Sequence, residues 1–386
     1  MRNVVIAGIG STRFGPHPDS GIIDLAVMAC RDAMRDAEIS RGEVEALFLG
    51  NFAGECLVNQ GTLASVVASR LGITGIPALR IEGACASGGL AVQQGIQSVM
   101  GGIYDVVVTV GVEKMTSATT AQVTTALAAA GDLEREMRTG ITFPGMFGMI
   151  MRVHMDRFGT TREEVAAVSV KNRAFGTKNP LAHFRKQTTM DEVLGSRLIA
   201  DPIRLFDCPP ISDGAAAVVI CTQERANTNN LANKPISVLG MAQCSGPSTL
   251  CEMEDLTVFP ATLQSARKAY ERAGVSPREI DVAEVHDCFT MAEILAIEDL
   301  GFVQKGEGGK ATQSGFTRGE GGPVVNPSGG LLSKGHPVGA TGSAQIYEVV
   351  KQLRGNAANQ VRDARIGLAH NMGGTCAVAT VTILAS

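Results

Sequence analysis

Apolar residues along the chain occur in short continuous runs that alternate with stretches of helical spacing. The runs predict buried strands at residues 2–8, 77–81, 105–111 and 365–369. Two stretches of helical spacing each place an apolar stripe on one face, formed by Val92, Ile96, Val99 and Met100 and by Ile346, Val349, Val350 and Leu353. Strands that alternate with helices of this length predict an α/β fold, with mostly parallel sheets covered by helices on both faces.

This pattern occurs twice. A helix, a turn, an acidic residue and a strand follow one another at residues 26–51 and again at residues 263–287. Each copy then continues through a loop and a helix into another strand, which indicates gene duplication. The 386 residues also exceed the roughly 250–300 at which a single core stops growing. We therefore expect two similar halves, residues 1–115 with 208–235 and residues 236–386.

The segment between the halves, residues 116–207, is more polar and contains many methionines and glycines. We interpret it as an inserted loop domain. Its stretch 161–178 carries Val165 and Val168 on one side, which predicts a helix and distinguishes the segment from a linker.

Composition excludes several classes of function. The net charge is -4, and no basic run with interleaved aromatic residues is present, so nucleic acid is not expected as a partner. No stretch of 18 apolar residues predicts a membrane span, and the first residues form a strand pattern without a signal peptide. The 9 cysteines contain no C-x-x-C pair, so we expect no metal site. Scattered in mostly apolar contexts, they fit a reducing cytoplasm.

Cys85 is the first candidate for chemistry. It lies between the strand predicted at residues 77–81 and the helix that carries Val92, in a segment of small residues. The N–H groups at a helix N-terminus favour a thiolate, and small neighbours leave the sulfur accessible. The sequence around Cys85 therefore allows either a nucleophile or a buried core cysteine.

Two later segments also carry reactive side chains. His286, Asp287 and Cys288 follow a predicted strand, and strand ends are where α/β proteins bind ligands. His336 lies in a glycine-dense loop that lets the backbone approach a ligand. A nucleotide-phosphate loop is excluded there because neither Gly-x-Gly-x-x-Gly nor the Walker spacing is present. Taken alone, each histidine is also compatible with a structural role.

Together, four ordered motifs resemble the thiolase superfamily. They are Cys85-Ala86-Ser87, His286-Asp287-Cys288-Phe289, Gly335-His336-Pro337 and His370-Asn371-Met372-Gly373-Gly374. The His-Asp-Cys-Phe box is similar to that of the sterol-carrier-protein type and its bacterial and archaeal relatives. Commoner members take a second cysteine from a C-terminal Cys-x-Gly box, but here that place reads Asn371-Met372-Gly373, and Cys376 lies beyond it.

The resemblance implies a CoA-dependent acyltransferase that cleaves 3-ketoacyl-CoA or runs the reverse Claisen condensation. Cys85 would carry the acyl thioester, His336 would take its proton, and Cys288 would exchange a proton with the α-carbon. Supporting groups would be His286 and Asn371, with the N–H of Gly373 beside that of Cys85 in an oxyanion hole. Cys376 would be structural.

The resemblance also implies that coenzyme A is a substrate, that no cofactor is needed, and that the protein forms a homodimer or a dimer of dimers. Met146, Met149 and Met151 are candidates to line an acyl pocket, with ordinary core packing as the alternative. Two other functions remain open. One is an aldolase or lyase acting on β-hydroxyacyl-CoA, although such relatives replace the nucleophilic cysteine. The other is a scaffold for a small OB-fold, zinc-ribbon protein, which could also accompany catalysis.

Overall fold

The computed structural model describes residues 2–229 and 233–386. Within them, ten strands form one mixed sheet in the order β10-β9-β11-β12-β8-β1-β7-β4-β2-β3. Its strands are β1 (Val4–Ser11), β2 (Ala46–Gly50), β3 (Ala78–Ile81), β4 (Val106–Glu113), β7 (Gly214–Thr222), β8 (Ile236–Ser245), β9 (Val282–Glu284), β10 (Val324–Val325), β11 (Ile366–Gly373) and β12 (Val378–Ala385). The strands predicted at residues 2–8, 77–81, 105–111 and 365–369 are thus confirmed as β1, β3, β4 and β11.

The strand order of the first half is repeated in the second. From the centre outward the orders are β1-β7-β4-β2-β3 and β8-β12-β11-β9-β10, and corresponding pairs have the same parallel or antiparallel sense. A short antiparallel pairing of β1 with β8 joins the halves. The duplicated α/β architecture predicted from the sequence is therefore confirmed. The expectation of mostly parallel strands was wrong, because five of the nine pairings among the described strands of this sheet are antiparallel: the central strands β1, β7, β8 and β12 all pair antiparallel with their neighbours.

Helices cover the sheet and build the inserted segment. They are α1 (Ile22–Asp36), α2 (Gly54–Val58), α3 (Leu63–Leu71), α4 (Ser87–Met100), α5 (Thr120–Ala128), α6 (Phe143–Phe158), α7 (Arg162–Gly176), α8 (Met190–Leu194), α9 (Gln223–Asn229), α10 (Pro260–Ala273), α11 (Thr290–Asp299), α12 (Gly308–Gln313), α13 (Gly330–Lys334) and α14 (Thr341–Leu353). Helix α4 packs on β2, β4 and β7, helix α14 packs on β11, β9 and β7, and the two helices contact each other. They are the two helices predicted after Cys85 and His336, and they lie between the halves.

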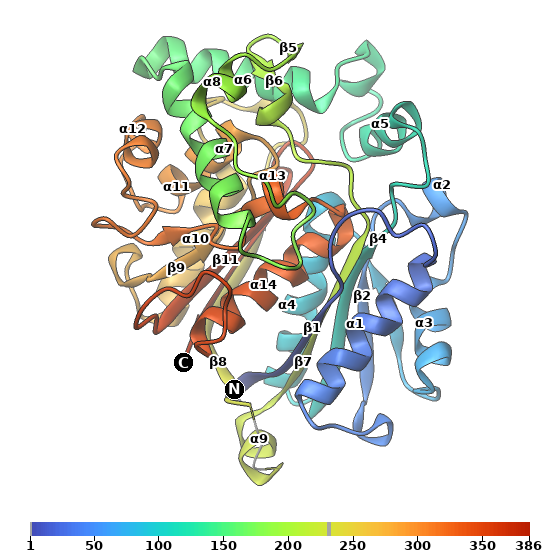
Figure 1. The fold of residues 1–386 in the computed structure, drawn as a ribbon. Coiled ribbons are helices and arrows are strands. Elements are labelled where there is room, and N and C mark those ends of the chain that lie inside the picture. The colour runs from blue at the N-terminus through green and yellow to red at the C-terminus, as the bar shows by residue number, and fades with distance from the viewer. Residues whose placement is uncertain (1, 230–232) are drawn as a thin grey trace.

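The inserted segment lies at one end of the sheet. Figure 1 shows α5, α6, α7 and α8 above the strands, with a small hairpin of β5 (Leu198–Ala200) and β6 (Ile203–Arg204). The helix predicted at residues 161–178 is α7, and Thr161 caps it by accepting a hydrogen bond from the N–H of Glu164. None of the described helices is both long and apolar enough to cross a membrane.

Candidate active site

Cys85 lies in a single turn of 3-10 helix, Ala84–Ala86, between β3 and α4. The turn is tight: Ala84 has a φ of 51°, a left-handed conformation that costs a non-glycine residue about 1 kcal/mol or more. The Ser87 hydroxyl stabilises it by donating to the Ala84 carbonyl oxygen at 2.7 Å and accepting from the Gly83 N–H at 3.0 Å. This local network places the half-buried Cys85 thiol at the start of the helix.

Close packing of α4 against α14 brings Cys85 to His336. A Cβ on Gly342 would lie 2.2 Å from the backbone nitrogen of Gly89, and a Cβ on Gly88 would lie 2.7 Å from the Gly339 carbonyl oxygen. Only glycine allows the two helix starts to approach this closely. As a result, the ligating atoms of Cys85, His286 and His336 all lie within 4.8 Å of one another.

The hydrogen bonds of His336 define its tautomer. Its Nδ1 lies 2.8 Å from the Thr341 hydroxyl oxygen, and that hydroxyl donates its proton to the Pro337 carbonyl at 3.1 Å. The hydroxyl can therefore only accept from His336, so Nδ1 carries the ring proton. The Nε2 atom keeps a free lone pair and can accept a proton.

His286 has the opposite tautomer. The Asn371 side-chain nitrogen donates to the Cys85 carbonyl oxygen at 3.1 Å and to His286 Nδ1 at 3.0 Å. Because Nδ1 accepts, the ring proton is on Nε2, and His286 can donate a hydrogen bond. The two imidazole rings lie edge to face with their centroids 5.1 Å apart. The site thus holds one proton acceptor and one donor.

Cys288 follows β9 and precedes α11, and its thiol lines the same cavity as Cys85. Burial raises its pKa well above the ordinary value, and the nearby Cys85, Asp287 and Cys376 add to the effect. Cys376, by contrast, is 1% exposed, contacts Thr262 and Met372, and is absent from the cavity wall. This placement agrees with a reactive Cys288 and a structural Cys376.

The Cys85 thiol is protonated at neutral pH. Burial and the charge of Glu113 raise its pKa to about 12, although the N–H groups of Cys85 and Gly374 act in the opposite direction. The expected thiolate at a helix start is thus outweighed by desolvation. Burial also lowers the pKa of His336 to about 3, so its imidazole is neutral. Because burial disfavours both the thiolate and the imidazolium, we expect the proton to move from Cys85 to His336 as the sulfur attacks.

Backbone donors surround the sulfur. Gly373, the last residue of β11, packs tightly, and a Cβ there would lie 2.1 Å from the Gly83 carbonyl oxygen. The next residue, Gly374, lines the cavity, and its N–H lowers the pKa of the Cys85 thiol, as does the N–H of Cys85 itself. The assignment of the Gly373 N–H to an oxyanion hole stays a prediction, and Gly374 is a neighbouring donor that the sequence did not indicate.

An apolar cavity of about 200 Å³ opens above these side chains. Its walls include Val123, Leu127, Phe143 and Phe147 from the inserted segment, together with Cys208. The three methionines proposed for an acyl pocket are absent from this wall. Met146 and Met151 are fully buried in the core, as the alternative of ordinary core packing predicts, and Met149 is 44% exposed. Residues 143 and 147, on another face of α6, line the cavity instead.

Two buried carboxylates that the sequence did not single out for a role fix the catalytic loops. Glu113 accepts hydrogen bonds from the N–H groups of Phe52, Ala53 and Gly339, and burial raises its pKa to about 7. Asp287 accepts from the Leu331 N–H at 2.7 Å, which ties the His286 loop to α13, just before His336. Both carboxylates accept hydrogen bonds from backbone N–H groups of segments distant in the sequence. The hydrophobic pattern of the chain cannot predict these contacts.

Metal binding by Cys85, His286 and His336 conflicts with these hydrogen bonds. A histidine that binds a metal through Nε2 must carry its proton on Nδ1. In His286, Nδ1 faces the amide N–H of Asn371, and turning that amide would set its oxygen against the Cys85 carbonyl. As hydrogen-bonded in this structure, His286 therefore does not suit a metal ion.

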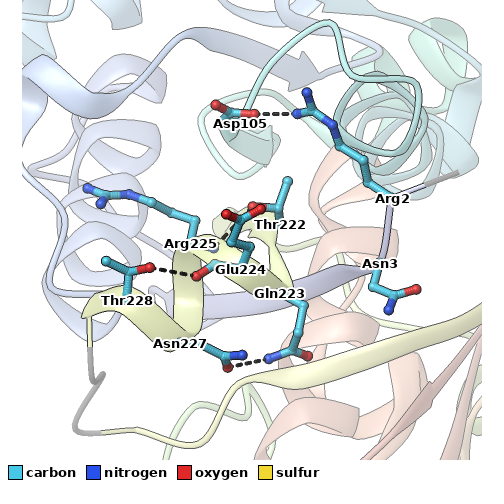
Figure 2. Close-up of a pocket in the computed structure, with 9 residues that line it drawn as sticks. All are labelled: Arg2, Asn3, Asp105, Thr222, Gln223, Glu224, Arg225, Asn227 and Thr228. Atoms are coloured by element: carbon cyan, nitrogen blue, oxygen red, sulfur yellow. Dashed lines mark hydrogen bonds and ion pairs between the residues drawn. The ribbon is translucent and has the colours of Figure 1, made fainter.

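A second hollow lies at the opposite end of the strands, between the chain start and α9 (Figure 2). Its polar side chains bind one another: Arg2 pairs with Asp105, and the Gln223 amide donates to Asn227 at 2.8 Å. The described residues that line it include neither histidine nor cysteine. We therefore assign the chemistry to the cavity above Cys85.

Family models match both halves of the chain. Residues 4–224 match the model described as "Thiolase, N-terminal domain", and residues 242–386 match "Thiolase C-terminal domain-like". The inserted segment lies within the first match.

Related proteins agree with these models. An acetyl-CoA acetyltransferase of Methanothermobacter thermautotrophicus is 46% identical over 99% of this chain and 99% of its own. Sterol carrier protein 2 of Bos taurus is 35% identical over 97% of this chain and 70% of its own length. The solved structure of the Ltp2-ChsH2(DUF35) aldolase has a TM-score of 0.87 and 26% identity, and the match covers 100% of this chain and 98% of that one.

Proposed function

The chain belongs to the thiolase family and is a CoA-dependent acyltransferase, and we propose that Cys85, His336 and Cys288 divide its chemistry among them. The observation that carries this proposal is the meeting of Cys85, His286 and His336 within 4.8 Å. Cys85 is the nucleophile, His336 the proton acceptor and His286 the hydrogen-bond donor, and the three are close enough to act on one substrate carbonyl.

In the first half-reaction, the Cys85 sulfur attacks the 3-keto carbon of a 3-ketoacyl-CoA while His336 Nε2 accepts the thiol proton. The bond between C2 and C3 breaks, the acyl group stays on Cys85 as a thioester, and acetyl-CoA leaves as its enolate. Cys288 gives its proton to the enolate carbon. Burial raises the pKa of the Cys288 thiol, so at neutral pH the thiol carries the proton that it gives to the enolate carbon.

In the second half-reaction, CoA attacks the thioester and Cys85 recovers its proton. Cys288 is restored when the thiol proton of CoA replaces the one that it gave away. The N–H groups of Cys85 and Gly374 face the oxygen of the thioester, with Gly373 as the alternative second donor, and His336 and His286 face the enolate oxygen. Asn371 is a positioning residue, since it binds both the Cys85 carbonyl and His286. Run backwards, the same groups condense two acyl-CoA molecules.

Coenzyme A enters this scheme as a substrate, and no step calls for a cofactor or a metal. The cycle starts and ends with the same protonation states of Cys85, His336 and Cys288. The chain's own side chains therefore supply every proton transfer. We also assign the protein to the cytoplasm and to lipid metabolism, in line with nine cysteines that are all free.

The partners that we propose are a second copy of the chain, as a homodimer or dimer of dimers, and a small OB-fold, zinc-ribbon protein. The exposed edge strand β3 supports the first, because Leu79 on it is 54% exposed and its outer backbone groups have no strand beside them. The proposal of a small OB-fold, zinc-ribbon partner rests on the similarity of this chain to a chain in the solved structure of the Ltp2-ChsH2(DUF35) aldolase.

Thiolysis assays test this function. Purified protein with CoA and acetoacetyl-CoA should form acetyl-CoA, and Cys85→Ser should lower kcat by at least about a thousandfold, because a nucleophile is lost. The exposed Cys56→Ser is the matched control and should change nothing. Cleavage of a β-hydroxyacyl-CoA without thiolysis would instead identify an aldolase, and no turnover of either would favour a scaffold.

A further inference from the structure

The apolar cavity above Cys85 extends beyond the catalytic side chains into a chamber built by the inserted segment. We propose that this chamber, lined by Val123, Leu127, Ala128, Ile141, Phe143 and Phe147, binds the acyl group that Cys85 carries. The enzyme then accepts neutral acyl groups longer than acetyl and rejects chains that end in a carboxylate. This inference rests on the proposed function and adds its substrate class.

The size of the cavity argues for an acyl group longer than acetyl. The volume of the whole cavity, from the catalytic side chains to the inserted segment, is about 200 Å³. An apolar protein cavity of about 150 Å³ holds a molecule of benzene, so this one has room for an acyl chain of roughly six carbons. An acetyl group on Cys85 would leave most of the apolar wall without a partner, and that wall would contribute nothing to binding.

The chemistry of the wall argues for a neutral chain. The residues that line the cavity include neither lysine nor arginine, among those that the structure describes. Its hydroxyl groups come from Thr124 and Thr142, and Thr142 already caps α6 by accepting from the Gly145 N–H. A carboxylate placed here would lose its hydration without gaining a cation, which costs several kcal/mol.

The same wall is poorly suited to the pantetheine arm of CoA. That arm carries two amides, and each amide needs hydrogen-bond partners once it is buried. The chamber is instead closed by aromatic carbon: Phe147 stacks on Phe289 with ring centroids 4.5 Å apart, and Phe289 directly follows Cys288. Phe147 therefore forms the wall next to the reactive thiols and limits the space available to the acyl chain.

A substrate series tests the proposal with the full-length protein. We would measure kcat/KM for thiolysis of straight-chain 3-ketoacyl-CoAs from acetoacetyl-CoA upward, each beside a chain of equal length that ends in a carboxylate. We expect kcat/KM to rise until the acyl group fills the cavity at about six carbons. Each carboxylate-ended substrate should be at least about tenfold poorer than its neutral match.

Two neighbouring alanines provide a matched pair of variants. Ala128 lines the cavity, whereas Ala129 is exposed and does not. Ala128→Phe should lower the ratio of kcat/KM for the six-carbon acyl group to that for acetoacetyl-CoA by at least about tenfold, because the added ring occupies the chamber. Ala129→Phe should leave the ratio unchanged. Leu127→Ala enlarges the chamber and should shift the optimum to longer chains, which keeps the test decisive if Ala128→Phe does not fold.

Other outcomes would overturn the inference. If wild-type protein cleaves acetoacetyl-CoA but no longer substrate, or cleaves carboxylate-ended and neutral chains equally well, the chamber does not select the acyl group, while the proposed function stands. If Ala128→Phe raises KM for CoA and leaves the chain-length ratio unchanged, the chamber holds the pantetheine arm. Failure to cleave any 3-ketoacyl-CoA contradicts the proposed function itself.

Discussion

At the scale of single residues, hydrogen bonds outside the cavity fix the roles of the groups within it. Thr341 holds the proton of His336 on Nδ1, and Asn371 holds that of His286 on Nε2. The pair therefore offers one lone pair and one N–H without any rearrangement. Preorganised groups of this kind are more effective in catalysis than groups that must first reorient.

The two cysteines near the C-terminal half should behave differently. Cys288→Ala should lower thiolysis by at least about a hundredfold, because the α-carbon loses its proton donor, while acylation of Cys85 continues. Cys376→Ala should leave kcat nearly unchanged. Rapid-quench measurement of acylation beside steady-state thiolysis separates the steps. Equal loss of thiolysis in both variants would assign the proton transfer to Cys376 instead.

Removal of His336 should impair two steps. His336→Ala should slow acylation of Cys85 and also nearly eliminate the exchange of acetyl-CoA α-protons in deuterated water. His336→Asn keeps a hydrogen-bond donor but no base, so it should acylate as slowly as the alanine variant yet retain more exchange. Near-wild-type acylation in both variants would show that the thiol loses its proton without His336.

At the scale of elements, the contact between α4 and α14 assembles the site from the two halves. Gly342→Ala would set a Cβ 2.2 Å from Gly89 and from the Asn371 side chain, and should lower the free energy of unfolding by about 1–3 kcal/mol. Gly42→Ala, with nothing within 4 Å of its Cβ, is the control and should be neutral. Urea unfolding measures both. Equal free energies of unfolding for Gly342→Ala and the wild-type protein would show that the close contact between α4 and α14 does not require glycine at this position.

The sequence predicts the elements of this fold better than the surfaces between them. Continuous apolar runs and helical spacing identify β1, β4, β11 and α7 because burial on a sheet or helix face imposes a period on the chain. The cavity wall has no such signature: Met146 and Phe147 are adjacent apolar residues of α6, and only Phe147 lines the cavity. Likewise, Glu113 and Asp287 gain their N–H partners from distant segments.

At the scale of the whole molecule, β3 ends the sheet with an exposed strand edge. In the proposed homodimer, with β3 as the contact between two copies, Leu79→Glu should shift the protein toward monomer, because a charge would enter that contact. Ile103→Glu, at a residue that is 68% exposed between α4 and β4, is the control and should leave the proposed dimer intact. Analytical ultracentrifugation distinguishes the states. A dimer that persists unchanged in Leu79→Glu would place the interface elsewhere.

The central claim of this account is that Cys85 carries the acyl group, and mass spectrometry of the acylated protein tests it most directly. After brief incubation with an acyl-CoA and acid quenching, one acyl mass should appear on the peptide that contains Cys85. The label should be released by CoA and be absent from Cys85→Ser. An acyl group on the peptide of Cys208, Cys288 or Cys376 instead, or no acylation at all, would contradict the account.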